Sequence, residues 1–446
     1  MSRKSISTKP RLYQAMMNVM PMMGVVSSGI LAFSLGHSSV AKAAEDSMDY
    51  IHWQAAYTGE AAANVKGGEQ RGSAYAGQLF LGADFDMEKA VDWKDTQIHV
   101  ALTNRHGQNL AQNYIGNSTS VQEIYGGQSS RLARLTIEKT FFDGQLQVEA
   151  GRTVANISFL GSSLCQYFQT NAACGNPTFV FRTSNFTWWP VSSWGGHAQY
   201  NINDKMYFHA GVYEENTVHQ RPGDHGFDWR TSGSTGVIVP LTLGYRTSWE
   251  NDNYPRQYEI GGWYDGADYT DPARDSNGDY AAVTAEDYAT RNGRSGAFMR
   301  FEQTVLRPNL NSQRSVTVFG AFLTGLSGEL TQDYFIKAGF VKHGTFAGRD
   351  EDTIGFVVTR QQYSDDALED QARLRMLNGG VGMPASSQTM MELSYGIQFN
   401  DHIRIQPNLH YIINPDQFNE RSRAEDLPDA WVVGLRLDVD LAGLLF

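Results

Sequence analysis

The chain has only two cysteines, and they lie nine positions apart in the segment SSLCQYFQTNAACGNP, residues 162–177. Cys165 and Cys174 are too widely spaced for a C-x-x-C redox or zinc motif, and no cluster of histidines or further cysteines stands near them. A disulfide that closes a short loop fits this spacing better, and such a bond requires an oxidising compartment. The pair therefore predicts an exported protein rather than a metal centre.

Catalytic signatures are absent from the sequence. It contains no H-E-x-x-H, G-x-S-x-G, Walker A or dinucleotide-binding motif. The acidic segment 271–280 suggests calcium, but aligning Gly278 with the EF-hand glycine puts Ala273 and Thr284 at the first and last ligand positions. We therefore expect no cofactor, no metal ion and no enzyme. Scattered carboxylates that form a glycosidase pair stay open as an alternative.

The first 43 residues have the three parts of a signal peptide. Basic residues come first, Met22–Leu35 is mostly apolar or small but too short to span a bilayer, and residues 41–43 supply an A-x-A cleavage site. We predict cleavage after Ala43. The mature chain then keeps all 48 acidic residues but loses five of the 36 basic ones, which gives a net charge of −17. An acidic exported protein is not expected to bind nucleic acid.

The C-terminal third alternates apolar and polar residues. Segments 388–400, 401–413 and 430–441 each place apolar side chains on one face and polar ones on the other. Each alternation runs for about ten residues, the length that a tilted strand needs to cross a membrane. Strands of a soluble sandwich are usually about half as long. These segments therefore predict transmembrane β-strands.

The same pattern, followed along the whole chain, predicts sixteen strands. They lie near 50–65, 74–87, 95–104, 131–142, 145–155, 191–201, 204–214, 236–248, 256–266, 296–306, 314–324, 331–342, 350–361, 388–400, 401–413 and 430–441.

The connections between these strands alternate between short and long. The long connections are 105–130, 156–190, 215–235, 267–295, 362–387 and 414–429, and DDALEDQARLR at 365–375 predicts a short loop helix. Short periplasmic turns, long external loops and an even strand count are typical of outer-membrane barrels, and sixteen strands leave an aqueous channel. We predict an all-β fold: one transmembrane antiparallel β-barrel over residues 44–446, in the bacterial outer membrane.

Both cysteines fall in the long loop 156–190. A disulfide there would contribute at most about 3 kcal/mol by the chain-entropy argument. A stiffened loop of this kind is a candidate constriction loop for the pore. A stapled surface loop with no role in the pore is the alternative.

Several blocks of the mature chain resemble one known family. In order they are YTGEAAANVKGG, NRHGQNLAQNYIGNSTSVQEIYGG, SRLARLTIEKTFFDGQLQVEAGR, CQYFQTNAACGNP, FEQTVLRP, GRDEDTIGFVV and IQPNLHYIINP. These blocks are similar to the carbohydrate-selective porins of the OprB type. The resemblance implies a sixteen-stranded barrel that passes glucose and related sugars by facilitated diffusion. It also implies inward-folded loops that form an eyelet of arginine, acidic and aromatic residues.

The resemblance and the predicted pore mouth give candidate sugar contacts. Hydroxyl groups need charged or amide partners, and the apolar face of a pyranose stacks on aromatic rings. The candidates are Arg152, Arg105, Glu123, Trp188 and Trp189. An ion pair of Arg152 with Glu123 that only pins the loops is the alternative, and Trp194 is expected in the aromatic girdle at the outer interface.

Six charged residues fall on inward faces of the predicted strands, and we interpret them as a hydrated pore wall. They are Arg134, Glu138, Glu149, Arg404, Arg436 and Asp438.

The C-terminal segment departs from the family pattern, in which an aromatic residue usually ends the last strand in phase with the outward face. Here the outward residues of that strand are odd-numbered and Phe446 is even, so LAGLLF extends past the expected end at Leu441. A bulge that restores the phase, or an assembly signal farther upstream, would account for this.

A passive channel for glucose-like sugars is the leading hypothesis. A general non-selective porin, an exported β-rich carbohydrate-active enzyme and a closed structural barrel are the alternatives. Outer-membrane lipid and lipopolysaccharide are the expected surroundings, and monomer and homotrimer both stay open.

Overall fold

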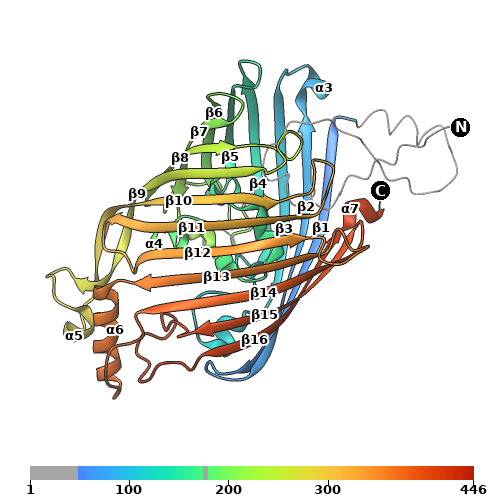
Figure 1. Cartoon of the computed structure of the whole chain (residues 1–446). Helices are drawn as coiled ribbons and strands as arrows, with labels where there is room; N and C mark the ends of the chain where they lie inside the picture. Colours follow the sequence, from blue (N-terminus) through green and yellow to red (C-terminus); the bar gives the residue numbers. More distant parts are fainter. Residues whose placement is uncertain (1–48, 160, 174–178, 446) are drawn as a thin grey trace, which may run out of the picture.

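The computed structural model describes residues 49–159, 161–173 and 179–445 and consists of a single closed β-barrel (Figure 1). Every strand pairs antiparallel with its sequence neighbours, and β1 pairs with β16 to close the sheet. The strands are β1 (Ile51–Lys66), β2 (Gly72–Asp86), β3 (Thr96–Gly107), β4 (Ser129–Phe141), β5 (Leu146–Thr153), β6 (Ser193–Asn201), β7 (Met206–Glu215), β8 (Gly236–Arg246), β9 (Arg256–Asp275), β10 (Tyr288–Leu306), β11 (Ser315–Ser327), β12 (Gln332–His343), β13 (Thr353–Tyr363), β14 (Ser387–Asn400), β15 (Ile403–Ile413) and β16 (Ala430–Asp440).

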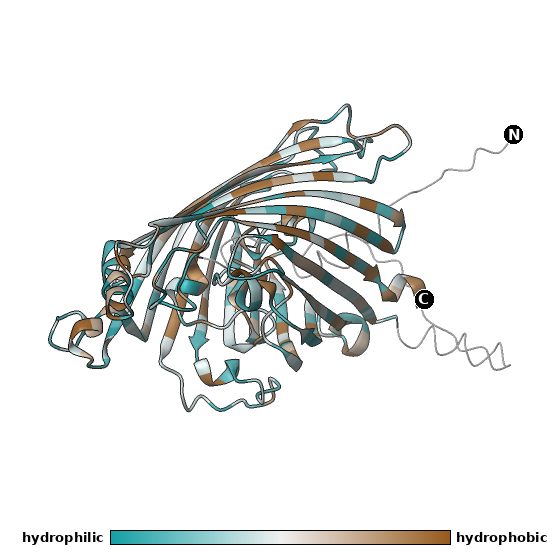
Figure 2. Ribbon diagram, turned by 90° about the horizontal axis from the view of Figure 1, so that it is seen from below, coloured by the Kyte–Doolittle hydropathy of each residue, from teal (hydrophilic) through white to brown (hydrophobic). Residues whose placement is uncertain are grey.

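The period of two in the sequence corresponds to two faces of the barrel wall. In β16 the side chain of Leu435 is 47 % exposed on the outside, whereas its neighbour Arg436 is 4 % exposed on the inside. Figure 2 shows the resulting alternation of hydrophobic and hydrophilic residues along the strands. The prediction of sixteen antiparallel transmembrane strands is therefore confirmed, and the boundaries agree within a few residues for most strands.

The connections at one end of the barrel are short. This end holds the start of β1, the end of β16 and the connection 87–95, where the Asp86 carboxylate caps the helix α3 (Met87–Val91). The long connections lie at the opposite end, as predicted for an outer-membrane barrel.

One expected loop is mostly a hairpin. Segment 267–295 was predicted as a loop, but β9 continues to Asp275 and β10 begins at Tyr288, with register shifts along the way. The extension carries polar residues on both faces, and ion pairs such as Arg294–Asp265 at 2.7 Å hold it. Apolar alternation could not reveal these strand ends because they project beyond the membrane.

Two helices pack beside this extended hairpin. They are α5 (Ala281–Thr284) and α6 (Asp365–Leu377), and they lie together beyond the ends of the strands (Figure 1). The guanidinium of Arg274 binds the carboxylate of Asp366 at 2.7 Å. The predicted helix 365–375 is confirmed as part of α6.

The chain leaves the sheet at its C-terminal end. β16 stops at Asp440, and the short helix α7 (Leu441–Leu445) follows, with the Gly443 amide donating to Asp440 Oδ1 at 3.0 Å. The residues after Leu441 therefore do not extend the strand, and the phase of the strand need not reach Phe446, which lies outside the described residues. The predicted signal peptide, 1–43, also lies outside them and stays a prediction.

Among the described residues, no helix has both the length and the apolar content for crossing a membrane.

A charge on the lipid-facing side of the wall tests the assignment of the two faces. Leu435→Arg should lower the free energy of unfolding by about 2–4 kcal/mol, because it places a guanidinium near the middle of the hydrocarbon. Urea unfolding in lipid vesicles measures this. Val283→Arg is the matched control, because Val283 is 66 % exposed in α5, beyond the membrane. Equal effects of both changes would contradict the assignment.

Candidate functional site

Two of the long connections fold into the barrel. We call residues 108–128, between β3 and β4, the first inner loop, and the described residues 154–159, 161–173 and 179–192, between β5 and β6, the second inner loop. The first contains the short π-helix η1 (Ala111–Ile115). The second contains η2 (Ala155–Ile157), η3 (Ser163–Tyr167), η4 (Asn171–Ala173) and α4 (Val180–Thr183). In Figure 2 such short helical segments lie within the curve of the sheet.

The second inner loop is held by apolar packing against the inside of the wall. Phe159, Phe179 and Phe186 from the loop form a buried cluster with Trp263 and Phe298 from β9 and β10. The interior of a barrel is usually polar. Here each fully buried aromatic ring contributes roughly 2–3 kcal/mol, which fixes the loop inside the barrel.

The first inner loop packs against strands near the closure of the barrel. Leu110, Ile115 and Val121 are fully buried against Met390 and Ile412, from β14 and β15. Ala172, from the second inner loop, belongs to the same cluster, so the two loops meet on this part of the wall.

Buried carboxylates on the wall bind the backbone of both loops. Both oxygens of Glu392 accept hydrogen bonds, from the amides of Gln169 and Thr170, each at 2.8 Å. Glu60 Oε2 accepts from the Ile124 amide at 3.2 Å, and Glu60 Oε1 accepts from the Arg436 guanidinium at 3.0 Å. Because buried N–H groups need acceptors, these carboxylates fix where each loop crosses the lumen.

The two inner loops are also joined to each other. The Glu123 amide donates to the carbonyl of Gln169 at 2.8 Å, and the Asn171 amide donates to the carbonyl of Ser120 at 3.0 Å. The Arg182 guanidinium, from α4, donates to a carbonyl of the first inner loop. The loops thus form one bonded unit rather than two independent flaps.

Arg105 lies where the two loops meet. Its side chain is 4 % exposed, and its Nε donates to Gln78 Oε1 at 2.7 Å. Its Nη1 donates to the carbonyls of Gly126 at 3.0 Å and Trp189 at 3.4 Å, one from each inner loop. The Glu123 carboxylate, half-buried, is close enough to interact electrostatically with Arg105. The structure therefore brings Arg105, Glu123 and Trp189 together.

The two adjacent tryptophans have different surroundings. Trp189 lies with its ring centroid 6.2 Å from that of Phe80, and both residues line a small hollow. Asp84, His99 and Arg134 supply polar atoms to the same hollow. Trp188 instead packs against the apolar cluster of the second inner loop. Of the two rings, only that of Trp189 lines this hollow.

The six inward charged residues are on the lumen side of the wall, but they are less than a tenth exposed. Arg134 and Glu149 form an ion pair at 2.7 Å, and Glu138 lies 3.5 Å from His99. The others lie beneath the inner loops: Arg404 stacks under Tyr167, and Arg436 binds Glu60 and Asp438. A freely hydrated wall was expected, whereas these residues anchor one another and the loops.

Arg152 is the candidate that lies farthest from this group. In β5 the lumen-facing residue is Glu149, and the register pairs Arg152 with Trp194, whose ring is 38 % exposed on the outside. The Arg152 side chain is 1 % exposed and binds the carbonyl of Ser192 at 2.5 Å. Glu149 and Arg152 are three positions apart, so the period of two already places them on opposite faces of the strand. Placing Arg152 at the pore mouth did not take this alternation into account.

Cys165, in η3, is disulfide-bonded, and Cys174 lies outside the described residues. No group of three or more potential metal ligands occurs among residues 49–159, 161–173 and 179–445. Sequence reasoning gave no role to Glu60 and Glu392. Their inward position in strands was visible, but their partners are loop amides that no residue pattern identifies.

Comparisons with known proteins agree with this architecture. The model of the carbohydrate-selective porin OprB family matches residues 70–441. Porin B of Pseudomonas aeruginosa is 30 % identical over 396 residues, 85 % of each chain, and the putative porin QuiX of Acinetobacter baylyi is 27 % identical over 85 % of this chain and 86 % of its own. The structure of Pseudomonas putida OprB at high pH superposes with a TM-score of 0.80 and 27 % identity, covering 90 % of this chain and 96 % of that one.

These matches span nearly the whole barrel and include the segments that form both inner loops. Family and fold indicate a channel of the outer membrane rather than an enzyme. The chain belongs to the OprB family of carbohydrate-selective porins.

Proposed function

We propose that this porin lets glucose and closely related sugars diffuse passively through the constriction formed by the two inner loops, and that it catalyses no reaction. One observation carries the proposal: the inner loops are bonded to each other across the lumen, at the point where charged and aromatic side chains converge. A passage that binds sugar weakly at one site can select it and still release it.

Three residues take the sugar contacts in this proposal. Arg105 and Glu123 offer hydroxyl groups a donor and an acceptor, and guanidinium suits this task because its donors are fixed in a plane. Trp189 provides the ring on which the apolar face of a pyranose stacks. Trp188 supports the loop behind it, and Arg152 is not among the contacts because the strand register puts it on the outward face, opposite Trp194.

The proposal also includes the surroundings of the barrel. The extended hairpin of β9 and β10, with α5 and α6, would meet lipopolysaccharide at the cell surface. Monomer and homotrimer are alternative assemblies, which chemical crosslinking in native membranes distinguishes.

Current through single channels tests the proposal directly. The purified mature protein in a planar bilayer should give discrete current steps that glucose reduces saturably, because bound sugar obstructs the passage of ions. A disaccharide is titrated separately to rank the size of the accepted sugar. Steps that are indifferent to every sugar would contradict selectivity and indicate a general porin, and folded protein without steps would indicate a closed barrel.

The neighbouring tryptophans provide a matched pair of variants. Trp189→Ala should weaken block by glucose by about threefold to tenfold, because a stacking contact is lost. Trp188→Ala should instead lower the free energy of unfolding by about 3 kcal/mol, because it leaves a cavity in the apolar cluster. Sugar titrations in the bilayer and urea unfolding measure the two effects. Wild-type glucose block in Trp189→Ala would remove this ring from the sugar site.

A further inference from the structure

The barrel wall has a notch where β5 and β6 end before the neighbouring strand β4 does. β5 and β6 contain 8 and 9 residues, whereas β4 contains 13. The pairing of β4 with β5 reaches only Leu135 and Arg152, so residues 129–134 of β4 have no partner in β5. Beside residues 129–134 of β4 the chain has already left the wall, after Thr153, to form the second inner loop.

The connection between β7 and β8 fills the notch, and we call residues 216–235 the seal loop. Its carbonyl at His225 accepts from the amide of Leu132 at 2.9 Å, and its carbonyl at Trp229 accepts from Trp194 Nε1 at 3.0 Å. At Gly226, where φ is +80°, an added Cβ would lie 2.3 Å from the carbonyl oxygen of Leu132. The seal loop therefore lies directly against β4.

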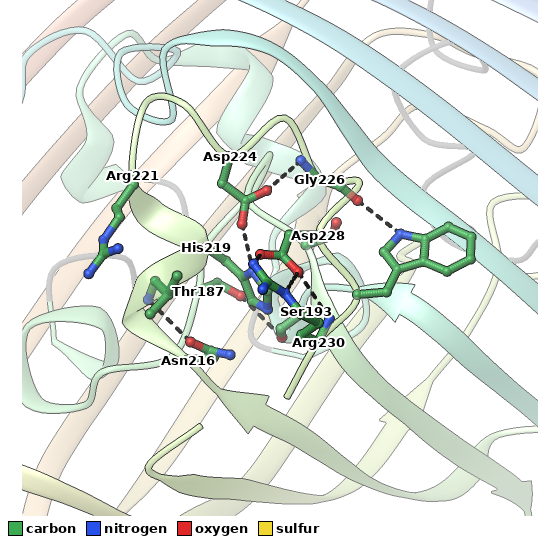
Figure 3. Close-up of polar contacts among 12 residues, drawn as sticks. Thr187, Ser193, Asn216, His219, Arg221, Asp224, Gly226, Asp228 and Arg230 are labelled. Carbon is green, nitrogen blue, oxygen red and sulfur yellow. Dashed lines mark hydrogen bonds and ion pairs between the residues drawn. The ribbon is translucent and has the colours of Figure 1, made fainter. Parts of the chain in front are cut away.

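Polar contacts inside the seal loop hold its shape (Figure 3). His219, in η5 (Thr217–Gln220), bonds through Nδ1 to Asp224 Oδ2 at 2.7 Å, and Asp224 Oδ1 accepts from the Gly226 amide at 2.7 Å. From the wall, Arg152 Nη1 lies 3.4 Å from His219 Nε2, and Glu214 lies 3.8 Å from the same nitrogen. Arg152 thus belongs to the seat of the seal loop.

One guanidinium joins the seal loop to the first inner loop. Arg131 is 2 % exposed, and its Nη1 and Nη2 donate to the carbonyls of His219 at 2.9 Å and Arg221 at 2.8 Å. Its Nε donates to the carbonyl of Gly127 at 3.1 Å. The register of β4 shifts just beyond Arg131, where Ala133 is the extra residue, and bulges of this kind redirect side chains.

Gly127 lies next to residues that adjoin two of the proposed sugar contacts. A Cβ on Gly127 would lie 2.8 Å from Pro190, the residue after Trp189. The preceding carbonyl, of Gly126, accepts from Arg105 Nη1 at 3.0 Å. A shift of Gly127 would therefore move both the aromatic ring and the arginine at the constriction.

We propose that the seal loop, which fills the notch in the wall, sets the width and the sugar affinity of the constriction, and that Arg131 is the positioning residue that couples them. This inference rests on the proposed sugar passage and adds to it an element that belongs to neither inner loop. The coupling is mechanical, because a planar fork of donors bonded to three carbonyls fixes their relative positions.

Arg131→Met removes all three bonds and keeps an apolar stem. It should admit larger neutral polyethylene glycols into the pore than the wild type admits, and weaken glucose block by about threefold to tenfold. The matched control is Arg307→Met. Arg307 is 5 % exposed, and its guanidinium likewise bonds only to backbone carbonyls, of Trp249, Asp252, Leu310 and Ser312, away from the inner loops.

A second pair of variants leaves Arg131 intact. Gly226→Ala forces the seal loop away from β4, whereas Gly223→Ala, in the same loop, meets no atom within 4 Å. We expect Gly226→Ala to widen the constriction in the same direction as Arg131→Met, and Gly223→Ala to match the wild type. Because this pair keeps the Arg131 side chain, the test stays usable if Arg131→Met does not fold.

Two measurements separate the proposed sugar passage from the proposed positioning by the seal loop. They are the size of the largest polyethylene glycol that enters the pore and the block of the current by glucose. A wild-type channel that glucose does not block would refute the sugar passage, while the polymer limit would still report the positioning. Wild-type polymer limits in Gly226→Ala and in folded Arg131→Met would overturn the inference. Equal widening by Arg307→Met would also overturn it, because the effect would then be general loosening of the barrel.

Discussion

The carboxylate of Glu392 determines where the constriction can form. It is fully buried in the barrel wall and accepts the backbone amides of Gln169 and Thr170, each at 2.8 Å. Gln169 and Thr170 are buried, and buried N–H groups need acceptors. A buried carboxylate is costly unless donors surround it. The carboxylate of Glu392 and the two amides therefore offset the cost of each other's burial. Glu60 repeats the arrangement for the first inner loop, with Arg436 as a second donor.

These bonds between wall carboxylates and loop amides explain how loops come to fill part of a wide barrel. Sixteen strands enclose an aqueous channel unless something fills it. Here hydrogen bonds to wall carboxylates hold the inner loops, and apolar clusters fill the space between loop and wall. Arg105 bonds to both loops where they meet.

The wall of the barrel could be predicted from the sequence because one physical rule governs it. Lipid on one side and polar groups on the other impose a period of two, and this period located the strands. It failed at the ends of β9 and β10, which project beyond the membrane and carry polar residues on both faces. The rule holds only where hydrocarbon surrounds the strand.

The candidate site was predictable in part. Resemblance to a family pointed to Arg105, Glu123 and Trp189, which the structure brings together. The same reasoning placed Arg152 in the pore mouth, although it lies in the seat of the seal loop. Glu392 was visible as an inward residue, but its role depends on amides more than 220 positions away in the chain. Local pattern carries no information about such partners.

Hydrogen exchange at two amides tests the central claim most directly. In the wild-type porin the amides of Gln169 and Thr170 should exchange slowly, because Glu392 accepts both. In Glu392→Ala they should exchange much faster, while strand amides of β14 stay protected. Unchanged protection of these two amides in Glu392→Ala would show that the carboxylate does not hold the loop across the lumen, and would contradict the account.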